Sequence, residues 1–211
     1  MRFSSFSKSV LTLCFVGLFS SLTLAAPPVP PVKEASTFGI DGAHSRIGFG
    51  VKHMVINTVY GNFNKFTGTI RFDEKDITKS SVEVTIKADS INTNNEGRDK
   101  HLRSADFFDV EKFPEITFKS TKIVKKGKGY ECIGQFTMHG VTQNIAFPFT
   151  INGPVTIGGK PRMGIEASLT LNRQLYGVSW SKKLDTGGAA VDDNVNITLN
   201  IEAVKQDAPK Q

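Results

Sequence analysis

Four histidines are the residues of this 211-residue chain best suited to metal binding or acid–base chemistry. They are His44, His53, His101 and His139. No two of them follow the spacings His-x-His or His-x-x-x-His, and the chain has no Cys-x-x-Cys pair, so a metal site would need ligands from separate segments. A hydrogen-bonded residue at a strand end or rim is the simpler interpretation of each histidine. We therefore expect no metal and no cofactor.

Nucleophilic catalysis has no better support. The chain contains neither a Gly-x-Ser-x-Gly elbow nor a glycine-rich phosphate loop after a strand. The paired acids Asp192 and Asp193 follow the glycine pair at 187–188, which is typical of turn chemistry. Cys132 shares strand parity with Tyr130, and this favours a buried, inert thiol over a reactive one. These patterns indicate a protein that is not an enzyme.

The elements that must position these residues are strands. Apolar residues alternate with polar or small ones, which is the pattern of a half-buried strand, over 47–51, 66–72, 82–88, 116–118, 130–137, 145–151, 165–171 and 195–201. Glycine- and proline-rich breakers separate these runs, and no long helix intervenes. Parallel strands would need crossover helices, so the pattern predicts an all-β fold of eight or more antiparallel strands, closed into a barrel or packed as a sandwich.

One charged segment interrupts the alternation. Within residues 94–109 either Asn94 or Asn95 can cap a short helix over about residues 98–105. The segment ends in Phe107 and Phe108, of which at least one should enter the interior. Further on, Pro148 lies inside a strand pattern, and because proline lacks the N–H donor it indicates a sheet edge or a bulge.

The first 25 residues have the pattern of a secretory signal peptide. Two basic residues precede an apolar run at 10–24 that is short for a membrane span, and Ala25 follows as the expected cleavage site. An uncleaved anchor is disfavoured because four prolines end the run within residues 27–31, and lipid attachment through Cys14 is disfavoured because that residue lies inside the run. Residues 26–36 are expected to form a Pro-rich linker.

Processing changes what the composition implies. Removing residues 1–25 takes away two basic residues and no acid, which lowers the formal charge from +6 to +4, so the charge no longer points to nucleic acid. The 16 phenylalanines are many for this length, and glycine occupies strand positions such as Gly48, Gly61 and Gly134. Small residues inside a barrel leave room for a ligand, whereas the same phenylalanines can also pack a filled core. Composition alone leaves both alternatives open.

Several motifs resemble a known family. They include Ile40-Asp41-Gly42-Ala43-His44-Ser45-Arg46, Val51-Lys52-His53-Met54, Arg98-Asp99-Lys100-His101-Leu102, Asp106-Phe107-Phe108-Asp109, Phe113-Pro114-Glu115-Ile116 and Gly134-Gln135-Phe136-Thr137-Met138-His139-Gly140. In this order they resemble the YceI-like, polyisoprenoid-binding proteins from about residue 37 to 204. The resemblance implies an extended eight-stranded antiparallel barrel, lipocalin-like and periplasmic. Residues 205–211, which follow the domain, are expected to form a polar tail.

The family further implies that the lumen carries a long-chain amphipathic lipid, such as a polyprenyl quinone precursor or a polyprenyl phosphate. Combined with the apolar parity of the strands, this makes ten residues candidates for contact with the lipid: Phe49, Val51, Phe66, Ile70, Phe72, Phe118, Phe136, Phe147, Leu169 and Leu171. Long apolar tails supply affinity through burial, so few polar contacts are needed.

Six polar residues in the family motifs are candidates for the rim or the lipid head group: His44, Lys52, His53, Arg98, His101 and Arg173. For each of them a structural role at a strand end is the stronger expectation. Two other functions stay open, namely a quinone-linked redox accessory or enzyme that uses rim histidines, and a stress-response protein with a filled barrel. Expected partners are the lipid itself and, transiently, a membrane or a membrane redox protein, with the protein a monomer or a homodimer.

Overall fold

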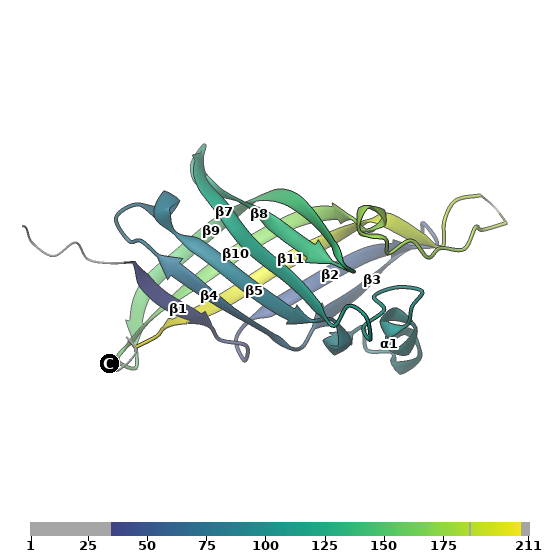
Figure 1. Cartoon of the computed structure of the whole chain (residues 1–211), viewed down its shortest axis with the longest axis horizontal. Helices are drawn as coiled ribbons and strands as arrows, with labels where there is room; N and C mark the ends of the chain where they lie inside the picture. The colour runs from purple at the N-terminus through teal and green to yellow at the C-terminus, as the bar shows by residue number, and fades with distance from the viewer. Residues whose placement is uncertain (1–34, 186, 208–211) are drawn as a thin grey trace, which may run out of the picture. The chain divides into compact units, whose positions relative to one another are not determined.

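The computed structural model describes residues 35–185 and 187–207. The predicted signal peptide with its cleavage site at Ala25, the linker up to residue 34 and the last four residues of the tail lie outside the described residues. Eleven strands form one antiparallel sheet (Figure 1). They are β1 (Ser36–Ile40), β2 (Arg46–His53), β3 (Asn57–Phe63), β4 (Phe66–Phe72), β5 (Ser81–Lys87), β6 (Ile91–Asn92), β7 (Glu115–Lys126), β8 (Gly129–Met138), β9 (Val141–Ile157), β10 (Lys160–Asn172) and β11 (Val191–Lys205). None of the helices in the described part is long and apolar enough to cross a membrane.

The sheet closes into a barrel of eight long strands, as the family resemblance implies, and this decides between the barrel and the sandwich that the strand pattern left open. Three of these long strands consist of two segments each. The first consists of β1 and β2, which both pair with β11. The second consists of β4, which pairs with β1, and β3, which pairs with β2. The third consists of β5, which pairs with β4, and β6, which pairs with β3. The remaining strands β7, β8, β9 and β10 connect β5 to β11, and the β1–β11 pairing completes the ring.

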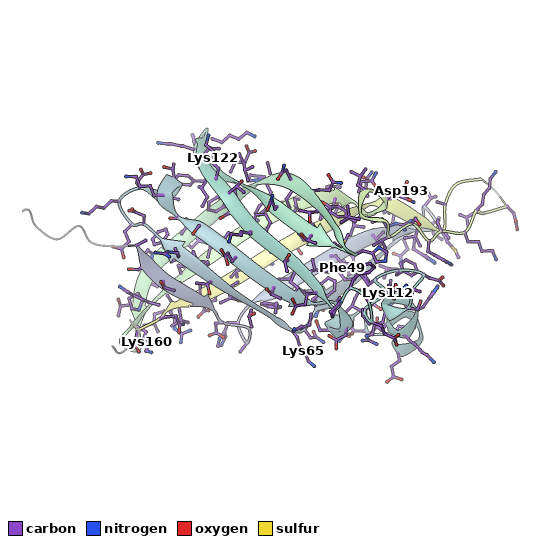
Figure 2. All side chains as sticks on the ribbon, viewed as in Figure 1. Phe49, Lys65, Lys112, Lys122, Lys160 and Asp193 are labelled. Carbon is purple, nitrogen blue, oxygen red and sulfur yellow. The ribbon has the colours of Figure 1, made fainter. Side chains whose placement is uncertain are left out.

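The alternation of residue types explains which face of each strand turns inward. Along β11 the apolar residues Val195, Ile197 and Leu199 face the interior, whereas the intervening asparagine and threonine side chains are exposed. Charged side chains cover the outside of the barrel, where Lys65, Lys122 and Lys160 point away from the sheet (Figure 2). The barrel therefore has an apolar interior and a polar outer surface.

The predicted helix exists but begins and ends earlier than expected. It is α1 (Glu96–Arg103) rather than residues 98–105, because the Asn95 side chain caps it by accepting from the backbone N–H of Arg98 at 2.9 Å. It ends at Ser104, whose hydroxyl donates to the His101 carbonyl. Three short 3-10 helices accompany it: η1 (Ile77–Lys79), η2 (Ala88–Ser90) and η3 (Arg173–Tyr176).

Pro148 lies at a sheet edge, as its missing donor predicts. Strand β9 pairs with β8 from Val141 to Phe149 but with β10 only from Phe149 onward, so Pro148 has no partner on the β10 side. The β8–β9 turn consists of His139 and Gly140, both with positive φ (52° and 75°), as a two-residue hairpin requires. The first half of β9 thus extends beyond the paired part of β10.

Candidate functional site

The barrel encloses an apolar cavity of about 250 Å³. All eleven strands contribute to its wall, which consists of 39 residues. Only three of them have an oxygen or nitrogen atom in the side chain: Ser80, Ser81 and Arg173. A cavity with so few polar groups suits a long hydrocarbon chain and offers little to a polar ligand.

Nine of the ten predicted contact residues line this cavity: Phe49, Val51, Ile70, Phe72, Phe118, Phe136, Phe147, Leu169 and Leu171. Phe66 does not line it. It is the first residue of β4, and its half-buried ring packs against the buried cluster that includes Ile86, its partner across the sheet. Strand parity places Phe66 on the inner face, but parity does not reveal which stretch of the barrel is filled and which is open.

Aromatic side chains pack where the lumen approaches α1. Phe108 meets Phe63 edge to face with ring centroids 5.8 Å apart, and Phe107 lies 5.2 Å from Trp180. Both phenylalanines reach the lumen, so the expectation that at least one enters the interior is confirmed. At the end of the barrel near β1 the lumen meets a second buried cluster, in which Phe38 and Ala203 are 0% exposed.

Sequence reasoning did not select the inner face of β11 as a contact surface. Its apolar residues Val191, Val195, Ile197, Leu199 and Ile201 all line the cavity. The signal was present, because these residues alternate as regularly as those that were selected. The lining contributed by the loops, such as Val178 after η3, has no such periodicity and only the fold reveals it.

Of the six candidate rim residues, Arg173 is the one that reaches the cavity wall. Arg173 is 4% exposed, and its guanidinium uses all five N–H donors within the protein. The acceptors are the carbonyl oxygens of Asp192 (2.9 Å), Val178 (2.6 Å), Trp180 (2.8 Å) and Val191 (3.3 Å), and Oδ1 of Asp193 (3.5 Å). Burial lowers the pKa of Arg173, with Asp193 and Asp192 opposing that shift.

Arg173 therefore joins the 178–180 segment to the start of β11 and has no free donor for a lipid head group. Every donor of this buried group is paired, as is usual for buried polar groups. A positive charge held this way beside an apolar lumen needs no anionic ligand, because backbone oxygens already satisfy it.

Arg98 and His101 belong to α1 and are also engaged. Arg98 donates through Nε to the Thr93 hydroxyl at 2.7 Å and through Nη2 to the Thr93 carbonyl at 2.8 Å. Nε2 of His101 lies 2.8 Å from a carboxylate oxygen of Asp106, and its ring contacts Trp180 at 5.0 Å. These residues anchor the helix and its aromatic neighbours to the barrel.

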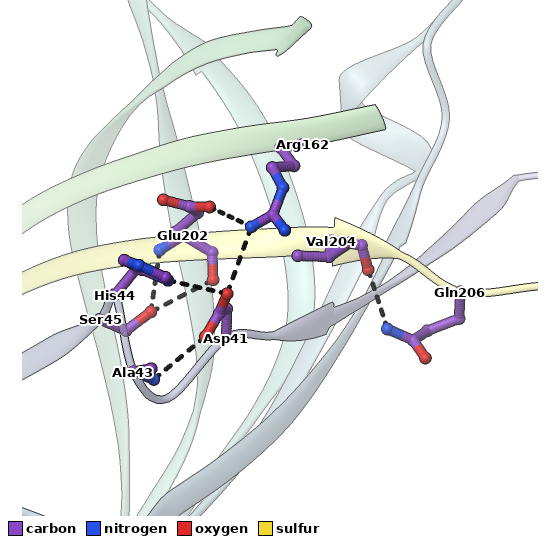
Figure 3. Close-up of polar contacts among 8 residues, drawn as sticks. All are labelled: Asp41, Ala43, His44, Ser45, Arg162, Glu202, Val204 and Gln206. Carbon is purple, nitrogen blue, oxygen red and sulfur yellow. Dashed lines mark hydrogen bonds and ion pairs between the residues drawn. The ribbon is translucent and has the colours of Figure 1, made fainter. Parts of the chain in front are cut away.

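His44 lies outside the barrel in an ion-pair network that ties the β1–β2 turn to β10 and β11 (Figure 3). Its Nδ1 is 3.0 Å from Asp41, while Arg162 bridges Asp41 at 3.3 Å and Glu202 at 2.5 Å. The hydrogen bond between His44 and Asp41 raises the pKa of the histidine and lowers that of the aspartate. Asp41, His44 and Glu202 have the atom types of a metal site, with ligand atoms within 4.8 Å, but Arg162 already supplies the positive charge between the carboxylates.

Lys52 and His53 lie at the end of β2, beside the start of β11, where His53 pairs with Val191. The six rim candidates are therefore spread over the β1–β2 turn, the end of β2, α1 and the start of η3. The structure does not bring them together into one polar site.

Comparisons with known proteins agree on one family. The model of the YceI-like domain matches residues 38–203. A UPF0312 protein of Pectobacterium atrosepticum is 34% identical over 203 residues, covering 94% of this chain and 98% of that protein. A UPF0312 protein of Pseudomonas aeruginosa is 36% identical over 201 residues, covering 92% and 98%.

Solved structures share the barrel. The chain is similar to BcnA of Burkholderia cenocepacia (TM-score 0.67, 25% identity, 77% of this chain and 98% of that chain). It is also similar to the YceI protein of Campylobacter jejuni (TM-score 0.65, 29% identity, 74% and 90%). A polyisoprenoid binding domain from Saccharophagus degradans, implicated in plant cell wall breakdown, shares the fold at 11% identity (TM-score 0.59, 82% and 100%). With the family model spanning the barrel from β1 to β11, the chain belongs to the YceI-like family.

Proposed function

We propose that this protein is a non-enzymatic carrier or storage protein that holds a long-chain amphipathic lipid in its lumen. The observation that carries the proposal is the composition of the cavity wall, in which 36 of 39 side chains lack oxygen and nitrogen. The buried cation in that wall, Arg173, is fully engaged by protein oxygens. Such a wall recognises a ligand by its apolar length and not by charge.

Burial of the tail supplies the affinity. Each methylene group moved from water into an apolar lumen contributes about 0.8 kcal/mol, so ten such groups contribute about 8 kcal/mol before the cost of ordering the chain. This amount exceeds what a few exposed hydrogen bonds to a head group would add. Chain length and width therefore set specificity.

A polyisoprenoid is the lipid class we favour, either a polyprenyl quinone precursor or a polyprenyl phosphate. The name of the Saccharophagus degradans domain assigns polyisoprenoid binding to a protein with the same fold. The expected signal peptide directs the chain out of the cytoplasm, so we propose the periplasm as the place where the lipid is bound.

The test is the identification of bound lipid. Protein purified from its native compartment would be extracted with organic solvent and analysed by mass spectrometry. Ala167→Phe places a ring in the lumen, whereas Ser168→Phe places the same ring on the outer face of the same strand and serves as the control. We expect a long-chain lipid in the wild type and in Ser168→Phe and a several-fold loss in Ala167→Phe. A wild type without long-chain lipid, or equal loading of both variants, would contradict the proposal.

A further inference from the structure

The turn between β2 and β3 holds three consecutive large apolar side chains in solvent. Met54, Val55 and Ile56 are 44%, 70% and 83% exposed. Turns usually carry glycine, asparagine or aspartate, because these residues adopt turn conformations easily and are well hydrated. We call these three residues the apolar tip. Contiguous exposed apolar residues are typical of surfaces that contact a partner or a membrane.

The apolar tip is held in place by the backbone. Met54 and Val55 have φ values of 49° and 65°, a left-handed conformation that is unfavourable for a β-branched residue such as valine. The N–H of Met54 donates to the Ala190 carbonyl at 2.9 Å and that of Ile56 to the His53 carbonyl at 3.2 Å. The strained turn is thus fixed with its side chains outward instead of being allowed to fold them onto the barrel.

Cationic residues occur on the two segments that adjoin the apolar tip. Lys52 adjoins it on β2, and Lys182 and Lys183 belong to the loop whose Ala190 binds the turn. Among the described residues, no carboxylate lies within 4 Å of these three lysines, and the loop contributes one acid, Asp185. Three cations that lack an ion pair beside an apolar tip fit a partner that is both apolar and anionic.

Tyr60 adds the aromatic component. It lies on β3, four residues after Ile56, and is 69% exposed, with its ring over Gly50, where an added Cβ would lie 3.0 Å from it. Tyrosine at such a position combines an apolar ring with a hydroxyl that stays hydrated, as in the aromatic belts of membrane proteins. The combination matches the interface of a lipid bilayer.

The hairpin between β9 and β10 provides a contrast. It also exposes apolar residues, Val155 at 55% and Ile157 at 60%. However, its cations are paired: Lys160 lies 3.3 Å from Asp207, and Arg162 lies 2.5 Å from Glu202. Exposed apolar residues with free cations therefore occur at the β2–β3 turn and not at this hairpin.

We propose that the apolar tip docks the protein on an anionic lipid bilayer. The role of this docking rests on the proposed carrier function, because it would bring the lumen to the membrane that supplies or receives the lipid. Val51 lines the lumen three residues before Met54, and Val191 lines it opposite His53. Insertion of the tip thus brings this end of the lumen close to the acyl chains.

Sedimentation with vesicles tests the docking. Vesicles of phosphatidylglycerol and phosphatidylethanolamine would be compared with vesicles of phosphatidylcholine, using the full chain. The test variant is the double substitution Val55→Asp with Ile56→Asp, and the control variant is Val155→Asp with Ile157→Asp in the β9–β10 hairpin. Residues 1–34 are identical in the two variants, so any contribution of that segment to vesicle binding is the same in both. We expect binding to anionic vesicles to fall by about tenfold or more in the first variant and by less than about twofold in the second. Equal losses, or equal binding to neutral vesicles, would overturn the proposal.

A second measurement locates the contact independently of any other membrane anchor. In a Trp180→Phe background, which removes the single tryptophan, Ile56→Trp and Ile157→Trp would each be mixed with vesicles that contain brominated lipids. We expect the brominated lipids to quench the fluorescence of the tryptophan at position 56 and not that of the tryptophan at position 157. The reverse pattern, or no quenching at either position, refutes the docking. Binding of a fluorescent polyprenyl phosphate without vesicles tests the carrier function separately. If the wild type does not bind this probe, the carrier function fails while the quenching result still decides the docking.

Discussion

Replacing Arg173 by methionine tests whether this residue stabilises the fold or binds the ligand. The substitution removes five hydrogen bonds and leaves four carbonyl oxygens, those of Asp192, Val178, Trp180 and Val191, without their donor. A hydrogen bond to a charged group contributes about 1.5–3 kcal/mol, and part of this loss is recovered when water reaches the freed carbonyls. Loss of one partner of a buried charged network typically costs about 3–5 kcal/mol.

We therefore expect Arg173→Met to lower the free energy of unfolding by about 3–5 kcal/mol, which corresponds to a decrease in Tm of roughly 10 °C for a domain of this size. Arg173→Lys should give an intermediate loss, because lysine keeps the charge but offers only three donors from one atom. Urea denaturation followed by circular dichroism measures both variants.

The same variant should leave ligand binding almost unchanged. Because no donor of Arg173 is free, affinity for a fluorescent polyprenyl phosphate should change by less than about threefold in Arg173→Met, measured at a temperature where the variant is folded. A large loss of affinity with little loss of stability would instead assign Arg173 to the lipid head group.

Three further predictions concern other residues. The pKa of His44 should lie above 6.5, as NMR titration would show, so the His44–Asp41 contact stabilises the fold below pH 6.5 and is lost as pH rises through the raised pKa. Asp41→Asn should lower the pKa of His44 toward its ordinary value, with the Glu202 charge still raising it, and an unchanged titration would contradict the contact. Burial raises the pKa of Cys132 to about 12, so in a Cys14→Ser chain iodoacetamide at pH 8 should label Cys132 only after unfolding, and rapid labelling of the folded protein would argue against burial. Asn95→Ala should destabilise the protein by about 1 kcal/mol in urea denaturation through loss of the cap of α1, and an unchanged midpoint would show that the cap contributes nothing.

The strands could be predicted because the alternation of apolar and polar residues that marks each strand lies within a short segment of the sequence. Alternation along β4 and β10 identified Ile70, Phe72, Leu169 and Leu171 as inward-facing, and all four line the cavity. The limit of this reasoning is Phe66, which has the right parity but lies where other side chains fill the barrel. Closure and filling depend on how distant strands meet, which the pattern of one strand does not contain.

The hydrogen-bond partners of Arg173 and the turn at Met54 and Val55 could not be predicted from local patterns. The acceptors of Arg173 belong to segments 5–20 residues away in the sequence, and nothing in those residues marks their carbonyls as acceptors. The turn carries apolar residues with positive φ in place of the glycine or asparagine that normally signals a hairpin. In the helix the cap was foreseen, but the first turn includes Glu96 and Gly97, which shifts its start before residue 98.

NMR of the complex shows whether the ligand lies in the barrel lumen. Protein with labelled methyl groups would be saturated with an unlabelled polyprenyl phosphate. We expect intermolecular contacts from the prenyl chain to inward methyls such as Leu169, Ile197 and Leu199, with one ligand per barrel, and none to the outward methyls of Thr170 and Thr198. Contacts confined to the outer face, or the absence of any contact with the lumen methyls at saturation, would contradict this expectation.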